Sequence, residues 1–159
     1  MSNTIDNFKG EYAWLSNFAE AKTSWDDKIY PTVEHAFQAV KTLDENQRET
    51  IRLSPTPGKA KRLGRKVVLR NNWEIIKEKV MLELVNRKFK DSTLRQLLID
   101  TGDATLVEGN TFHDNFWGNC TCSKCQHKPG KNMLGHILMR VRDNRDEADQ
   151  MGFRPPNRK

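Results

Sequence analysis

Apolar residues recur at spacings of three and four along most of the chain, which predicts a mainly helical protein. The longest apolar stripe predicts a helix from Asn72 to about Lys90, with Asn72 as its N-cap. The members of that stripe are Trp73, Ile76, Val80, Met81, Leu84 and Val85. A stripe of this width is typical of a helix that packs against a core.

Five further helices are expected from apolar spacing and from residues that start or stop a helix. The first runs from Val33 to Lys41, with Pro31 in its first turn. Asp44 and Thr56 are predicted N-caps of helices that end near Leu53 and Gly64. A helix opening at Asp91 should bury Leu94, Leu97 and Leu98 and end at Gly102. The last helix should run from about Asn132 to Asp146 and bury Leu134, Ile137, Leu138 and Val141.

Strand signals are short by comparison. Residues 25–30 read as a hairpin whose turn is Asp26-Asp27-Lys28, and residues 105–108 read as a strand or an extended segment. The expected fold class is therefore mainly α (α+β), a single compact helical domain over residues 1–148 with a small β element near the N-terminus. Residues 149–159 should form a flexible basic tail.

Composition favours a soluble, cytoplasmic protein. The 159 residues carry a formal net charge of +6, and the mean hydropathy is −0.81. No stretch is long and apolar enough to span a membrane, and the first ten residues lack the pattern of a secretory signal. Three cysteines packed between positions 120 and 125 do not form a disulfide framework and favour reduced thiols. The modest positive charge favours a phosphate-bearing ligand.

Two stretches bring polar side chains together. In the first helix, Glu34, Gln38 and Lys41 fall on one face because their spacing is close to two turns. The alternative is an ordinary solvent-exposed face of an amphipathic helix. The loop 108–119 carries Glu108, Asp114 and Trp117 without apolar periodicity, which is typical of binding loops. The alternative there is a surface turn.

The helix after Thr56 is rich in basic residues, which are Lys59, Lys61, Arg62, Arg65 and Lys66. They can form a phosphate clamp or a solvated face. The common glycine-rich nucleotide-binding motifs are absent from the sequence.

A compressed cluster of metal-ligand residue types follows, made of Cys120, Cys122, Cys125 and His127. Three cysteines and one histidine are an accepted zinc-ligand set. Structural zinc sites usually take their ligands from two separated pairs, so reduced thiols in a turn are the favoured interpretation. No metal ligand and no required cofactor are assigned from the sequence.

Several landmarks in the same order resemble the NADAR (YbiA-like) family from about Phe8 to Arg142. They are Tyr12–Phe18, Val33–Lys41, Ala60–Arg65, Trp73, Val80-Met81, Lys88-Phe89, Thr101-Gly102-Asp103, Leu106-Val107-Glu108, Asp114, Trp117-Gly118 and Lys131–Gly135. The cysteine-rich loop departs from the family pattern, where a plainer glycine-rich link is expected.

The resemblance implies an N-glycosidase that cleaves the bond between ribose C1′ and an amine nitrogen of a guanine-like base. Its implied substrates are ADP-ribose attached to guanine, free or in DNA, and ribosylamino-pyrimidine phosphates of riboflavin synthesis. The first class places some members in a toxin–antitoxin setting. The alternatives are a binding module for ADP-ribose or nucleic acid without turnover, and a zinc-stabilised interaction protein.

With this activity, Glu34, Lys41 and Asp114 are the predicted catalytic residues, meeting around one sugar-sized hollow. A carboxylate stabilises the oxocarbenium-like transition state, an acid protonates the leaving amine, and a partly desolvated lysine can attack C1′. The predicted substrate-binding residues are Asn17, Phe18, His35, Arg65, Trp73, Glu108, Trp117, Gly118 and Asn132. Trp73 or Trp117 would stack on the base, and the segment 59–65 would hold phosphate.

Overall fold

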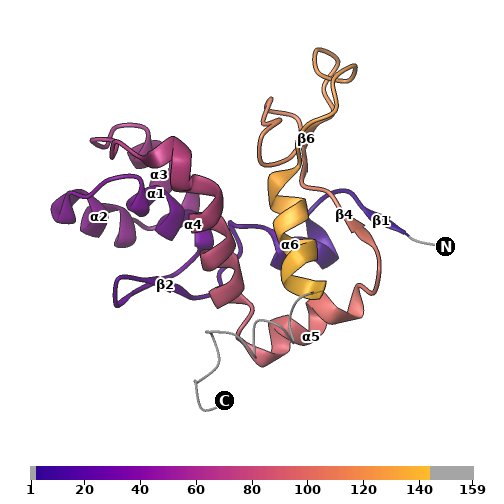
Figure 1. The fold of residues 1–159 in the computed structure, drawn as a ribbon, viewed down its shortest axis with the longest axis horizontal. Helices are drawn as coiled ribbons and strands as arrows, with labels where there is room; N and C mark the ends of the chain where they lie inside the picture. The colour runs from indigo at the N-terminus through magenta and orange to yellow at the C-terminus, as the bar shows by residue number, and fades with distance from the viewer. Residues whose placement is uncertain (1–2, 144–159) are drawn as a thin grey trace. The chain divides into compact units, whose positions relative to one another are not determined.

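The structure, a computed structural model, describes residues 3–143 and consists of helices with three small two-stranded sheets (Figure 1). The mainly α (α+β) prediction is confirmed. The chain forms two compact units: one is Lys9–Asp91, and the other combines the short segment before Lys9 with the chain after Asp91. The single domain over residues 1–148 stays a prediction, and the tail 149–159 lies outside the described residues. Within the described part, no helix is long and apolar enough to cross a membrane.

The Lys9–Asp91 unit holds most of the helices. They are the 3₁₀ helix η1 (Gly10–Leu15), α1 (Val33–Val40), α2 (Glu45–Arg52), α3 (Pro57–Gly64) and α4 (Trp73–Lys88), and its strands are β2 (Thr23–Trp25) and β3 (Lys28–Tyr30). Two helices start where sequence placed them, since the side chains of Asp44 and Thr56 accept hydrogen bonds from backbone N–H groups of α2 and α3.

The caps of α1 and α4 differ from expectation. Thr32 is the N-cap of α1, accepting from the His35 N–H, so Pro31 precedes the helix instead of forming its first turn. Asn72 occupies the N-cap position of α4 but makes no capping bond, because its side-chain oxygen accepts from Arg70 Nε at 3.0 Å. The helix α3 also ends differently: Gly64 is helical, and Arg65 is the C-cap.

The β2–β3 hairpin is confirmed, with Trp25 opposite Lys28. Its turn is Asp26-Asp27 alone; both have positive φ (48° and 64°), as a two-residue turn of this kind requires, so Lys28 belongs to the strand. The helix α4 packs on β2, where Thr23 Oγ1 donates to Leu84 O at 2.9 Å. The predicted stripe of α4 is buried except at Ile76, which is half-buried.

Every residue of α1 is buried, which is more than its predicted stripe required. The reason is its central place: α2, α3 and α4 all contact it, as Figure 1 shows for the left-hand group of helices. An eight-residue helix surrounded in this way cannot keep a solvent face. Its polar side chains therefore need partners inside the protein or in a ligand.

The other unit is built from parallel strand pairs and two helices. The strand β1 (Thr4–Ile5) pairs with β4 (Thr105–Leu106), and β5 (Gly109–Asn110) pairs with β6 (Asn119–Cys120). The helices are α5 (Ser92–Asp100) and α6 (Met133–Asp143). The helix α6 lies on β4, and a Cβ at Gly135 would come within 2.1 Å of Leu106 O, so only glycine permits this approach.

The inward residues of α6 are confirmed: Leu134, Ile137, Leu138 and Val141 are buried. The prediction for α5 is partly wrong. Leu98 is buried, but Leu94 is half-buried and Leu97 is 38% exposed, so the covered face of α5 is narrower than its apolar spacing predicts. Gly102 follows α5 with a φ of 65°, as predicted for a helix stop.

Candidate active site

The predicted polar face of α1 is a buried feature of the molecule. Glu34 is 7% exposed and Gln38 is 5% exposed, and Gln38 Nε2 donates to Glu34 Oε2 at 2.7 Å. The Glu34 N–H donates to the backbone oxygen of Asn17 at 3.1 Å, which brings the Asn17-Phe18 segment to the start of the same helix. The alternative of a solvated face is therefore wrong for Glu34 and Gln38.

Lys41 follows α1 as its C-cap and is half-buried. Burial lowers the pKa of Lys41 below that of an ordinary lysine, because removal of water disfavours the ammonium form. The Glu34 carboxylate acts in the opposite direction, while the cations Arg65, Lys61 and Lys77 lower the pKa further. The pKa of Lys41 thus responds to one carboxylate and three positive charges, and the amine is neutral in a larger fraction of molecules than a solvated lysine is.

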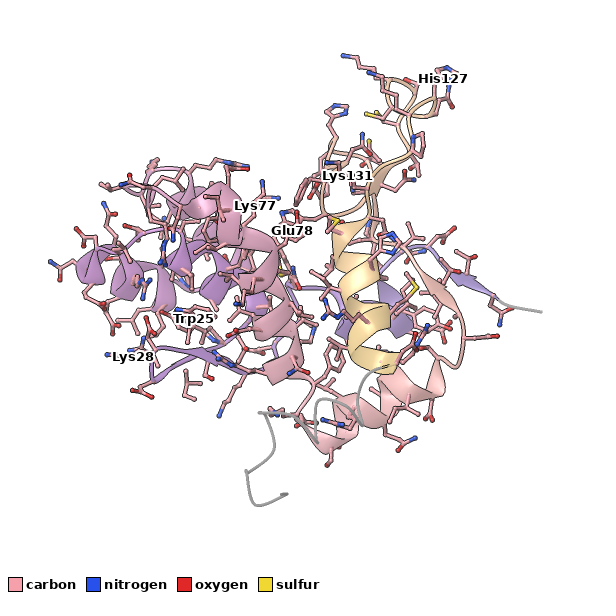
Figure 2. All side chains as sticks on the ribbon, viewed as in Figure 1. Trp25, Lys28, Lys77, Glu78, His127 and Lys131 are labelled. Carbon is pink, nitrogen blue, oxygen red and sulfur yellow. The ribbon has the colours of Figure 1, made fainter. Side chains whose placement is uncertain are left out.

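The three cations come from two helices that flank α1. Lys61 and Arg65 are one turn apart at the end of α3, where Lys61 is half-buried and Arg65 is exposed. Lys77 belongs to α4 and forms an ion pair with Glu74 at 2.7 Å; Figure 2 labels it on that helix. An amine beside exposed and half-exposed cations is suited to a substrate that carries phosphate.

Two buried amide oxygens in this unit have no hydrogen-bond partner among the described residues: Asn17 Oδ1 and Gln38 Oε1. Buried amide oxygens are nearly always bonded, so unpaired ones near candidate catalytic groups can accept from a ligand. Gly64 lies against the second amide, since a Cβ there would come within 1.9 Å of Gln38 Oε1. The α3 helix can therefore approach α1 closely only at a glycine.

Two predicted substrate contacts have structural partners instead. The ring nitrogens of His35 are bonded to Thr32 Oγ1 at 2.8 Å and to Ser54 O at 3.0 Å, and the residue is 2% exposed. Trp73 is 4% exposed and packs on Phe37 with ring centroids 5.0 Å apart. These contacts favour structural roles for His35 and Trp73. Phe18, by contrast, is 44% exposed and keeps a ring face for a ligand.

The predicted loop residues lie in the other unit. Asp114 Oδ1 accepts the backbone N–H groups of Phe116 at 3.1 Å and Trp117 at 2.9 Å. Asn110 holds the same turn, accepting from the Asp114 N–H and donating to Asp114 O. One oxygen of Asp114 therefore serves the turn, as the structural alternative expected. A catalytic role for Asp114 stays a prediction, and half-buried Trp117 remains a candidate for stacking.

Gly118 and Asn132 shape this loop. A Cβ at Gly118 would come within 2.1 Å of both Glu108 O and Glu108 Oε1, so the loop and the acid require a glycine there. Asn132 Oδ1 accepts from the Glu108 N–H at 2.9 Å, and Nδ2 donates to Leu106 O at 2.9 Å. Since both ends of its buried amide are used, Asn132 positions Glu108, and a direct substrate contact is not favoured.

Three thiols and an imidazole meet beside this loop, but the histidine is not the expected one. Ligand atoms of His113, Cys120, Cys122 and Cys125 lie within 4.8 Å of one another. His127 is not in this group; Figure 2 shows it at the outer end of the loop. The set with His127, which the sequence offered as the less favoured possibility, is therefore not the set that the structure brings together.

Sequence reasoning gave some polar residues of this region no role of their own. Gln38 was grouped with Glu34 and Lys41 by helical spacing, and Lys61 was included in the predicted phosphate-binding segment 59–65. Lys77 gave no signal, because its proximity to Lys41 depends on how α4 packs. The place of His113 beside the thiols could not be found from spacing, since β6 brings residues that are seven to twelve positions apart together.

Comparison with known proteins supports one family. The family model of the NADAR domain matches residues 6–144. The chain is 44% identical over 149 residues to N-glycosidase YbiA of Escherichia coli, covering 90% of this chain and 89% of that one. It is 38% identical over 138 residues to an N-glycosidase of Nostoc punctiforme, covering 83% and 85% of the two chains.

A solved structure and a more distant relative agree with this assignment. The NMR structure of the E. coli protein YbiA matches with a TM-score of 0.77 and 40% identity, covering 96% of this chain and 90% of that one. A riboflavin biosynthesis protein of Vibrio vulnificus is 32% identical over 139 residues, which are 86% of this chain and 36% of that protein. The protein is a hydrolase of N-glycosyl bonds, and the chain belongs to the NADAR family.

Proposed function

We propose that this N-glycosidase cleaves the ribose C1′–N bond of a phosphate-bearing, N-ribosylated guanine-like compound. The substrates proposed are ADP-ribose attached to guanine, in DNA or nucleotides, and ribosylamino-pyrimidine phosphates. The observation that carries the proposal is the buried Glu34–Gln38 pair beside Lys41, with Lys61, Arg65 and Lys77 close enough to act on its amine. The riboflavin biosynthesis relatives favour the pyrimidine phosphate as the second substrate class.

We assign to Glu34 the role of stabilising the positive charge that develops at C1′. As the C1′–N bond breaks, positive charge develops on C1′ and the ring oxygen, and a buried carboxylate stabilises it more strongly than one in water. The 2.7 Å hydrogen bond from Gln38 fixes the carboxylate in one orientation. The departing amine needs a proton, and the role of Asp114 as the acid that supplies it stays a prediction from the sequence.

Lys41 offers a covalent route. Its neutral Nζ attacks C1′ while the C1′–N bond breaks and the amine leaves with a proton. Opening of the sugar ring then gives an imine between Lys41 and C1′, and water hydrolyses the imine to return the lysine and the free sugar. The lowered pKa of Lys41 supports this route because attack needs the uncharged amine.

The cations beside Lys41 determine the proposed substrate class. The charges of Lys61 in α3, of its C-cap Arg65 and of Lys77 in α4 all act on the amine of Lys41. Such a group binds a phosphate or diphosphate attached to the ribose better than it binds a neutral nucleoside. The unpaired oxygen of Asn17 can accept a hydrogen bond from an N–H donor of the base.

A substrate panel tests the function directly. The purified chain is incubated with ADP-ribosylated guanine as a nucleotide and within DNA, and with a ribosylamino-pyrimidine phosphate, and the released sugar and base are measured by mass spectrometry. We expect cleavage of at least one of them. Binding of all three without release would favour the ADP-ribose or nucleic-acid binding module instead.

Glu34→Gln tests the site within the same assay. We expect kcat to fall by roughly 10²–10³-fold, the usual cost of removing one group that stabilises charge in the transition state. Glu45→Gln is the matched control, because it removes an exposed carboxylate from the start of α2 in the same unit. Near-normal turnover in Glu34→Gln would remove Glu34 from the mechanism.

A further inference from the structure

The cluster of thiols beside the loop has no part in the proposed cleavage. Nδ1 of His113 lies 3.4 Å from Cys122 Sγ, 3.5 Å from Cys125 Sγ and 3.9 Å from Cys120 Sγ. All four atoms lie within 4.8 Å of one another, and the cysteines are not paired in disulfides. Four soft or borderline ligand atoms therefore surround one point.

These distances match the spacing of ligands around a tetrahedral zinc ion. With Zn–S bonds of about 2.3 Å and Zn–N bonds of about 2.0–2.1 Å, tetrahedral geometry places a sulfur about 3.6 Å from the nitrogen. The three measured sulfur–nitrogen distances lie on both sides of that value. Three thiolates and one imidazole with no further ligand are typical of closed structural zinc sites.

The backbone around the cluster is held by the strand pair. Cys120 lies on β6 opposite Asn110, and its N–H donates to Asn115 Oδ1 at 2.8 Å. The N–H of Cys122 donates to Cys120 Sγ at 3.5 Å, which is the kind of contact that stabilises a thiolate. A turn after Cys122 then returns Cys125, whose N–H donates to Cys122 O at 3.0 Å. The backbone N–H groups of all three cysteines are therefore hydrogen-bonded, which holds this segment in place.

His113 belongs to the segment between the two strands, and its backbone conformation is unusual. Its φ is +72°, a region that non-glycine residues enter rarely and that is often associated with functional constraint. The residue lies between β5 and β6, so the imidazole comes from a loop separate from the one that carries Cys122 and Cys125. This supplies a second chain segment, which the cysteines between positions 120 and 125 do not provide by themselves.

From this geometry we propose that the chain binds one structural Zn²⁺ ion through His113 Nδ1 and the thiolates of Cys120, Cys122 and Cys125. The ion would tie the residue that precedes Asp114 to β6, and so hold the turn formed by Asp114, Phe116 and Trp117. The histidine ligand is His113, and His127 takes no part. The proposal does not depend on the N-glycosidase substrate.

Metal content and a cobalt spectrum test the site. The full chain, purified without a metal-chelating tag, is analysed for zinc by mass spectrometry; the zinc is then exchanged for Co²⁺. We expect one zinc per chain, and a cobalt spectrum with the intense visible bands of a tetrahedral site and sulfur charge-transfer bands. Protein that carries no zinc and gives no such spectrum, that holds iron or copper instead, or that has paired cysteines overturns the proposal.

Two histidine variants identify the fourth ligand. We expect His113→Ala to weaken zinc binding by more than about tenfold, because losing even an outer partner of a ligand costs 10- to 100-fold. His127→Ala is the matched control and should keep wild-type zinc affinity. His113→Cys should retain the metal and shift the cobalt spectrum toward four sulfurs, which separates loss of a ligand from misfolding. Loss of zinc in His127→Ala with retention in His113→Ala would overturn the assignment.

Discussion

Two lysines of the Lys9–Asp91 unit lose water on folding, and their surroundings give them different roles. Lys88 is 2% exposed, and its Nζ donates to Ser16 O at 2.9 Å and lies 5.2 Å from the Phe89 ring centroid. Because this amine is already bonded to Ser16 O, Lys88 holds the segment that leads to Asn17. Lys41 is half-buried, and its pKa is influenced by the Glu34 carboxylate and by three cations. A lysine whose pKa is perturbed in this way is a candidate for a catalytic role.

Lys41 should trap a sugar if it forms the imine. We expect sodium borohydride added during turnover to leave a sugar-sized mass on Lys41 of the wild-type chain and none on Lys41→Arg, whose guanidinium cannot attack. Because burial lowers the pKa of Lys41, the wild-type rate should rise with pH and level off below the pH at which an ordinary lysine titrates. Peptide mass mapping locates the adduct.

Lys28→Arg is the control for that experiment, since Lys28 is an exposed lysine of β3 in the same unit. It should still trap the sugar on Lys41. Turnover by the wild-type chain without any adduct would instead favour direct attack of water on C1′.

Lys88 should make stability depend on pH. Burial lowers its pKa from 10.5 to about 7, so between these values the unfolded chain binds a proton that the folded chain does not. The free energy of unfolding must then rise with pH across that window, by up to about 1.4 kcal/mol per pH unit. Lys88→Met should lack this rise. Urea unfolding of both proteins at several pH values measures the difference, and parallel curves would contradict it.

At the scale of helices and strands, the sequence allowed prediction of whatever depends on nearest neighbours along the chain. The N-caps Asp44 and Thr56, the α4 stripe and the hairpin follow from local chemistry, and all are present. The complete burial of α1 could not be predicted, because it depends on three helices packing around one. The same holds for the pairing of β1 with β4, which joins segments about a hundred positions apart.

The candidate site was predictable to a similar extent. Glu34, Gln38 and Lys41 share a face through helical spacing alone, and the structure keeps them together. His35 and Trp73 have structural partners, because a polar or aromatic residue in a family landmark can serve the core equally well, and their contact with a ligand stays a prediction. His113 was missed because its φ of +72° and its approach to the thiols are properties of the folded loop.

The contact between α3 and α1 should tolerate no side chain at Gly64. A Cβ there would lie 1.9 Å from Gln38 Oε1 and 2.9 Å from Gln38 Cβ. Overpacking costs about 1–3 kcal/mol, whereas glycine to alanine in a helix gains at most about 1 kcal/mol. We therefore expect Gly64→Ala to lower the free energy of unfolding and to reduce turnover, because displaced Gln38 no longer orients Glu34. Chemical denaturation and the substrate assay measure the two effects.

Gly58→Ala separates packing from helix propensity. It makes the same change in α3, where the nearest atoms to the new Cβ are 4.0 Å away, so it should be neutral or stabilising by up to about 1 kcal/mol. Adding Gln38→Ala to Gly64→Ala should restore part of the stability, because it removes the clash with Oε1 and Cδ of Gln38 and leaves only the 2.9 Å approach to the Cβ of residue 38. Equal effects of Gly58→Ala and Gly64→Ala would show that the α1–α3 contact is not tight.

At the scale of the whole molecule, the net charge of +6 acts on any anionic substrate before it binds. Exposed charges are screened over a Debye length of about 10 Å at 0.1 M salt, whereas half-buried ones are screened less. General attraction by the surface and specific contact near Lys41 should therefore respond differently to salt. Removing one charge near Lys41 and, in a second variant, one exposed charge distinguishes the specific contact from the general attraction.

Lys61→Gln and Lys28→Gln remove the same charge from a half-buried and an exposed position of one unit. Because a charge-assisted hydrogen bond contributes about 1.5–3 kcal/mol, Lys61→Gln should lower kcat/KM for a phosphorylated substrate by roughly tenfold or more, and salt should only partly mask the loss. It should hardly affect the same substrate without phosphate. Lys28→Gln should change kcat/KM less than about twofold, and salt should abolish the difference. Lys61 also lowers the pKa of Lys41, so Lys61→Gln should raise that pKa and shift the pH–rate profile to higher pH. A purely long-range effect would not produce this shift. If both variants lost activity equally, the cations around Lys41 would act through the overall field and would not hold the phosphate.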